Sequence, residues 1–150
     1  MRDTNVLALA DNEVLQVALF AWLVAQVAKT FLYWHKEGHF SLARFVGSGG
    51  MPSSHSALVV ALFTAVGLRE GWGSPITGIT LVFALIVMYD AAGVRRAAGK
   101  QARVLNKIVI ELAANKPLRE ERLKELLGHT PFEVIVGAIL GAAIAVWRLY

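Results

Sequence analysis

The sequence predicts an all-α integral membrane helical bundle with about four transmembrane helices and amphipathic helices at one membrane face. Composition is the first reason: 56% of the 150 residues are hydrophobic and 17% are charged, against about 25% in soluble domains. The second is that the apolar residues form uncharged blocks, whereas a soluble helix needs a polar face for water. A fully buried soluble bundle is the alternative. The length suits one domain, residues 1–150.

The four expected spans follow from these uncharged blocks. A helix needs about 20 apolar residues to cross the hydrocarbon core, with a range of about 17–25. The segments that fit, some at the short end, are residues 14–33, 52–68, 72–89 and 132–150. The apolar stretch ahead of Ala8 is too short for a secretory signal, so the first span is expected to be retained.

Residues 90–131 form a polar segment between the last two spans. Five apolar residues recur in it at helical spacing: Val104, Leu105, Ile108, Val109 and Leu112. A basic amphipathic helix beside membrane spans is expected to lie along the headgroup layer. A second helix is expected over residues 117–128, and the sequence leaves open whether the segment re-enters the bilayer.

Basic residues are distributed unequally between the two sides of this topology. The side with both termini and the 69–73 turn carries Arg2, Arg69 and Arg148. The other side carries Lys29, Lys36, Arg44, Arg95, Arg96, Lys100, Arg103, Lys107, Lys116, Arg119, Arg122 and Lys124. Positive residues accumulate in cytoplasmic loops, so the second side is expected to face the cytoplasm. Some of these cations also suit ligand binding, which would inflate the bias.

The stretch "GSGGMPSSHSALVVAL", residues 47–62, begins one span. Pro52 suits a helix start, and glycines allow an anion to approach free backbone N–H groups closely. Ser53 and Ser54 add donors, and His55 would stand beside a bound anion. The alternative is that the serines only cap the helix.

The stretch "GHTPFEV" begins the last span and places His129 four residues before Glu133. A carboxylate beside one ring nitrogen fixes the tautomer and makes the other a better nucleophile or base. Thr130 and Glu133 also fit a capping box, with Pro131 at the first helical position. The two interpretations are compatible.

Cations and one carboxylate complete the polar set at the same face. Arg95, Arg96 and Lys100 follow Asp90, which could orient one guanidinium group. They could equally rest on anionic headgroups, and Lys29 could simply snorkel to the interface.

In the four-span topology these groups converge at the ends of different spans. Two histidines, several cations and a helix N-terminus suit a phosphate carried on a lipid, since phosphoryl transfer mostly needs positioning and charge neutralisation. No carboxylate cluster suggests a metal site, no cofactor is implied, and the aromatic–basic pattern of RNA binding is missing. There is no cysteine, so disulfides are excluded.

Three stretches, "GGMPSSHSA", "DAAGVRRAAGKQA" and "LKELLGHTPFEV", resemble a divergent branch of the type-2 phosphatidic acid phosphatase superfamily, relatives of vanadium-dependent haloperoxidases. The resemblance covers residue 29 to about residue 141. It implies that His129 is the nucleophile that forms a phosphohistidine and His55 the general acid. It further implies that Glu133 replaces the orienting aspartate, and that phosphate is bound by Lys29, Ser53 and Ser54.

Three departures from the superfamily signatures stand out. Lys36 replaces the arginine of Lys-x6-Arg-Pro, with no proline after it, and Ser54 replaces the glycine of Pro-Ser-Gly-His. The arginine six positions before the third-signature histidine has no match, because Leu123 stands there. Arg95 or Arg96 is proposed to supply that contact.

The resemblance implies a metal-independent membrane phosphatase acting on phosphatidate, phosphatidylglycerophosphate or isoprenyl diphosphate. The bias of basic residues predicts that its site lies at the cytoplasmic face, and the membrane is expected to be a bacterial plasma membrane. The alternative is a non-catalytic lipid-phosphate-binding membrane protein that keeps the superfamily pocket; a vanadate-dependent peroxidase suits a lipid-embedded site least. Four short helices form a thin shell around a site, which is compatible with a homodimer.

Overall fold

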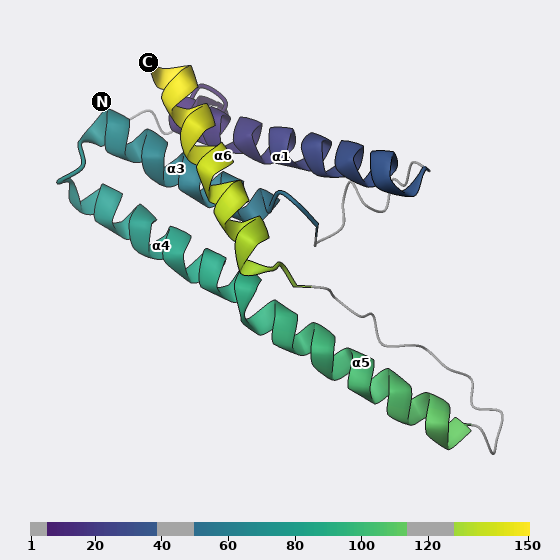
Figure 1. Ribbon diagram of the computed structural model, residues 1–150. Coiled ribbons are helices and arrows are strands. Elements are labelled where there is room, and N and C mark those ends of the chain that lie inside the picture. The colour runs from purple at the N-terminus through teal and green to yellow at the C-terminus, as the bar shows by residue number, and fades with distance from the viewer. Residues whose placement is uncertain (1–5, 39–49, 114–127) are drawn as a thin grey trace.

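The computed structural model describes residues 6–38, 50–113 and 128–150, and within these ranges the chain is helical (Figure 1). A short 3₁₀ turn, Val6–Leu9, precedes α1 (Glu13–Glu37). The helices that follow are α3 (Ser54–Glu70), α4 (Pro75–Ala92), α5 (Val94–Ala113) and α6 (Pro131–Leu149). The expected all-α architecture is confirmed.

Helix α3 occupies the centre of the bundle and packs against α1, α4 and α6. At one end Arg69 forms an ion pair with Glu13, so α1 and α3 run antiparallel. At the other end the start of α3 is hydrogen-bonded to the start of α6, through the Ser53 amide and the Glu133 carbonyl, so these two helices run parallel. The N-termini of α3 and α6 and the C-terminal halves of α1 and α4 therefore lie at the same end of the bundle.

Small residues make up most of the bundle core. Val17, Ala21, Ala61, Ala65, Ile144 and Ala145 form its main cluster. Large apolar side chains point outward instead, among them Ile79 (67% exposed), Phe83 (50%) and Ile139 (65%). Close packing of small residues with bulky residues facing outward is how helices associate in lipid, where the hydrophobic effect does not drive them together.

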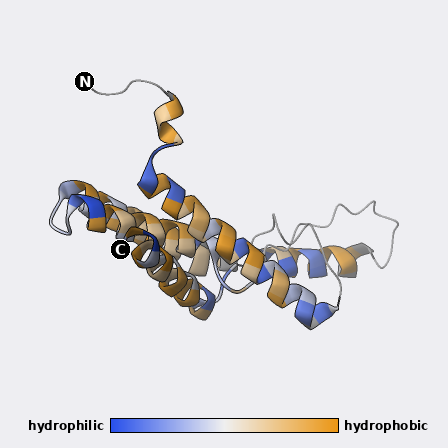
Figure 2. Ribbon diagram, turned by 90° about the horizontal axis from the view of Figure 1, so that it is seen from above, coloured by the Kyte–Doolittle hydropathy of each residue, from blue (hydrophilic) through white to orange (hydrophobic). Residues whose placement is uncertain are grey.

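Among the described residues, three helical stretches are long and apolar enough to cross a membrane: Glu13–His35, Pro75–Ile110 and Pro131–Leu149. In Figure 2 most of the ribbon of the bundle helices has the colour of hydrophobic residues. Helix α3, expected as the second of four spans, is not one of these three: it has 17 residues, which is the lower limit for crossing the hydrocarbon core. An all-α integral membrane bundle accounts for these features.

The helix boundaries differ from expectation at Pro52. Residue 52 was expected to begin the second span, but α3 begins at Ser54 and Ser53 is its N-cap. The reason is chemical: Ser53 Oγ accepts the Ser56 N–H, which proline cannot do. Pro52 lies one residue outside the cap and follows a cis peptide bond.

Helix α5 extends the direction of α4 beyond the bundle, and its only extensive packing among the described helices is against α4 (Figure 1). Its apolar stripe is confirmed as helical, yet Val104, Ile108 and Leu112 are 60%, 45% and 68% exposed. The second helix expected over 117–128 lies almost wholly outside the described residues.

Candidate active site

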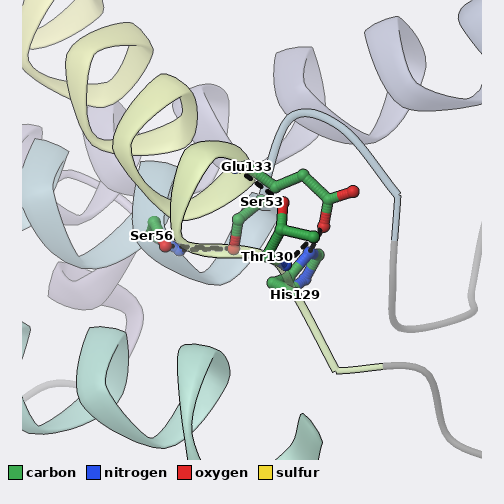
Figure 3. Close-up of polar contacts among 5 residues, drawn as sticks. All are labelled: Ser53, Ser56, His129, Thr130 and Glu133. Carbon is green, nitrogen blue, oxygen red and sulfur yellow. Dashed lines mark hydrogen bonds and ion pairs between the residues drawn. The ribbon is translucent and has the colours of Figure 1, made fainter.

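His129 is buried at the start of α6, with 2% of its surface exposed. Its Nδ1 lies 3.1 Å from Glu133 Oε2, one helical turn away (Figure 3). Its backbone N–H donates to the carbonyl oxygen of Ala91 at 3.1 Å, which fixes the residue against the end of α4. With Nδ1 protonated and donating to the carboxylate, Nε2 carries the lone pair that a nucleophile or base requires.

One carboxylate oxygen of Glu133 contacts both the His129 ring and the helix cap. Its Oε2 also accepts the Thr130 backbone N–H at 3.0 Å, while Thr130 Oγ1 accepts the Glu133 N–H at 3.3 Å. The capping box predicted from the sequence is therefore confirmed, and it coexists with the His129 contact. The Thr130 backbone N–H holds the carboxylate in place, so the imidazole orientation depends on a main-chain contact at the start of α6.

A turn of buried serines begins α3 beside this pair. Ser53, Ser54 and Ser56 are 0%, 2% and 0% exposed. Ser53 Oγ accepts from the Ser56 amide at 3.4 Å and from the Ser56 hydroxyl at 3.0 Å (Figure 3). Because Ser53 acts as acceptor in both contacts, they leave its own hydroxyl proton available to donate to an anion.

The serine turn and the histidine are tied together through the backbone. The Ser53 N–H donates to the carbonyl oxygen of Glu133 at 3.1 Å. The N-terminal ends of α3 and α6 therefore lie side by side. Each helix N-terminus carries a partial positive charge and N–H groups without helical partners, so the pair favours an anion between them.

Lys29 is buried on α1, with 5% exposure, although it was equally compatible with snorkelling to the interface. Its Cγ and Cδ lie 3.4 Å from the position that a Cβ on Gly50 would occupy. Gly50 has φ +85°, which side-chain-bearing residues rarely adopt. The backbone conformation therefore favours glycine at position 50, and the lysine stem lies against the loop that leads into the serine turn.

Two buried polar residues accompany Lys29 and were not identified from the sequence. Gln26 and Thr30 are 4% and 6% exposed, and Thr30 Oγ1 donates to the Gln26 carbonyl at 2.8 Å. The signal available in the sequence was their spacing: positions 26, 29 and 30 lie on one helix face. That face is apolar nearer the start of α1 and polar toward the site.

The remaining expected residues occupy less buried positions. His55 is half-buried in the first turn of α3, two residues after Ser53, and half-buried Asp90 adjoins the Ala91 peptide that holds His129. Lys100 is exposed on α5, outside the bundle. Arg95 and Arg96 belong to the first turn of α5, but their side chains lie outside the described part of the structure, as does that of Lys36.

The candidate site is therefore an imidazole held by a carboxylate, beside a turn of buried serines, in an all-α membrane bundle. Residues 10–144 match the family described as the Divergent PAP2 family, so the chain belongs to that family. It is 40% identical over 154 residues to "Uncharacterized membrane protein YuiD" of Bacillus subtilis (strain 168), covering 95% of this chain and 97% of that relative. No solved structure matches the chain.

Proposed function

We propose that the protein is a membrane phosphatase that hydrolyses a lipid phosphate through a phosphohistidine on His129, without a metal ion. The observation that carries the proposal is the buried His129–Glu133 contact of 3.1 Å, hydrogen-bonded through the Glu133 backbone to the serine turn. Membership of the Divergent PAP2 family supports the same chemistry. Phosphatidate, phosphatidylglycerophosphate and isoprenyl diphosphate are the candidate substrates.

In the first step His129 Nε2 attacks phosphorus, forming a P–N bond as the bond from phosphorus to the lipid oxygen breaks. Glu133 stabilises the positive charge that develops on the ring, because its carboxylate faces Nδ1. His55 donates a proton to the leaving group, which is a lipid alkoxide for the two monophosphates and a lipid phosphate for isoprenyl diphosphate. Lys29, the Ser53 hydroxyl and the backbone N–H groups at the helix starts neutralise the phosphoryl oxygens.

In the second step water replaces His129 on phosphorus. His55, now neutral, removes a proton from the attacking water and so returns to its protonated form. The P–N bond breaks, inorganic phosphate leaves, and His129 regains its lone pair on Nε2. Protons balance over the cycle, because His55 gives one to the leaving group and takes one from water.

Phosphate release by the purified protein, with each candidate lipid in EDTA, tests this function. We expect turnover of at least one lipid, and loss of turnover in His129→Ala. A wild-type protein that binds phosphate or vanadate but turns over no lipid would instead be the lipid-phosphate-binding protein that is the alternative. Equal rates in wild type, His129→Ala and His55→Ala would contradict the assigned roles.

A further inference from the structure

Helix α6 approaches α3 most closely where two glycines face the α3 backbone. A Cβ built on Gly137 would overlap the carbonyl oxygen of Ser53 and stand 3.1 Å from both its carbonyl carbon and its amide nitrogen. A Cβ on Gly141 would overlap the carbonyl oxygen of Ala57 in the same way, one turn further along both helices. Both glycines are buried within α6.

The backbone conformation of these residues does not require glycine, because only Gly38, Gly50 and Gly71 have positive φ among the described residues. Alanine is also the better helix former, by about 1 kcal/mol. The structural demand for glycine at position 137 is therefore the contact with α3. Small residues at such positions let helix backbones approach each other in a membrane.

We propose that Gly137 is a positioning residue for the reaction, because it sets the distance between the Ser53 turn and the His129–Glu133 pair. This inference rests on the proposed phosphatase function. Gly137 contacts the same Ser53 peptide whose N–H is bonded to the Glu133 carbonyl, so any side chain at position 137 must push the serine turn away from the start of α6. The serine turn that would bind the phosphate would then lie too far from the His129 nucleophile.

Gly141 provides a matched control. Gly141→Ala creates an equivalent overlap between the same two helices, but against Ala57, which belongs to no site. Both variants are expected to lower the unfolding temperature of the full chain in nanodiscs by similar amounts. Gly137→Ala should lower kcat at least tenfold and weaken inhibition by vanadate, a phosphate analogue, at least tenfold. Gly141→Ala should keep both within threefold of wild type.

A second pair of variants tests the same spacing without adding a side chain to α6. The φ of Ser53 is −69°, which proline adopts readily. Ser53→Pro removes the N–H that donates to Glu133, and Ser53→Ala removes only the hydroxyl. We expect Ser53→Pro to be at least tenfold slower than Ser53→Ala. If Gly137→Ala does not accumulate as folded protein, this pair of Ser53 variants still tests the spacing between the serine turn and the start of α6.

The outcomes separate the two proposals. An active wild type in which Gly137→Ala and Gly141→Ala lose turnover equally, or in which Ser53→Pro matches Ser53→Ala, would overturn the positioning role and leave the phosphatase intact. An inactive wild type would overturn the phosphatase, and vanadate binding by the same four variants would then test the spacing. If Gly137→Ala did not change the vanadate affinity of such an inactive protein, the positioning role of Gly137 would also be overturned.

Discussion

The amide of Ser53, the N-cap of α3, donates a hydrogen bond at 3.1 Å to the carbonyl oxygen of Glu133 in the first turn of α6, and so joins the starts of two helices that are far apart in the chain. Neither side chain makes this contact. It nevertheless brings the serine turn of α3 next to the peptide that carries the partner of His129. The site is therefore assembled by the backbones of α3 and α6. The first prediction concerns Glu133, which this contact joins to the serine turn.

The two roles of Glu133 are separable by mutation. Glu133→Gln should lower kcat by about 100-fold or more, because a neutral amide cannot stabilise the imidazolium that forms on His129. Thr130→Val removes only the hydroxyl of the cap. It should cost about 1 kcal/mol of stability and leave kcat within threefold of wild type. Lipid-phosphate hydrolysis and thermal unfolding of both variants check this.

The comparison of those variants identifies which role matters. If Thr130→Val lost as much turnover as Glu133→Gln, Glu133 would act only as a capping residue, and the orienting role would be wrong.

Lys29 is predicted to bind the phosphate. Lys29→Met keeps most of the buried stem beside Gly50 but removes the charge, so vanadate inhibition should weaken at least tenfold. Lys107→Met is the charge-matched control, since Lys107 is exposed on α5, and it should change inhibition less than twofold. Equal effects of the two variants would show that net charge, and not the buried lysine, attracts the anion.

The membrane topology can be read from single cysteines, because the chain contains none of its own. Lys107→Cys on α5 should react with an impermeant maleimide added from the cytoplasmic side, and Trp72→Cys, at a 59% exposed position in the α3–α4 turn, from the opposite side. Ile79→Cys and Ile139→Cys should resist the reagent from both sides, since these exposed apolar positions face lipid. Labelling of positions 72 and 107 from the same side would contradict the four-span arrangement.

Local sequence signals predicted the features that depend on neighbouring residues. Hydropathy predicted the membrane bundle. The Thr130–Glu133 spacing predicted the capping box, and the His129–Glu133 spacing predicted the carboxylate beside His129. Signals of this kind depend on helical periodicity, which is written into residues three or four positions apart. The expected convergence of His55 with His129 goes further, and it remains a prediction.

Long-range contacts were not predictable in the same way. The spacing of residues 26, 29 and 30 places Lys29 on a polar helix face, but the sequence does not show that the loop at Gly50 lies against its stem. Hydropathy also cannot show which apolar residues face lipid and which face α3, so Gly137 gave no signal of its contact with Ser53. Helix α3 begins at Ser54 and not at Pro52 as predicted, because the Ser53 side chain accepts the hydrogen bond that caps the helix.

The central claim is that His129 carries the phosphoryl group, and trapping that intermediate tests it most directly. A His55→Asn variant lacks both the acid of the first step and the base of the second. A ³²P-labelled aryl phosphate releases its phenolate without that acid, so mixing it with the variant should leave acid-labile, alkali-stable label on the peptide containing His129. The His55→Asn/His129→Ala double variant should remain unlabelled. Label on any other residue, or turnover by wild type with no phosphoenzyme trapped in His55→Asn, would contradict the account.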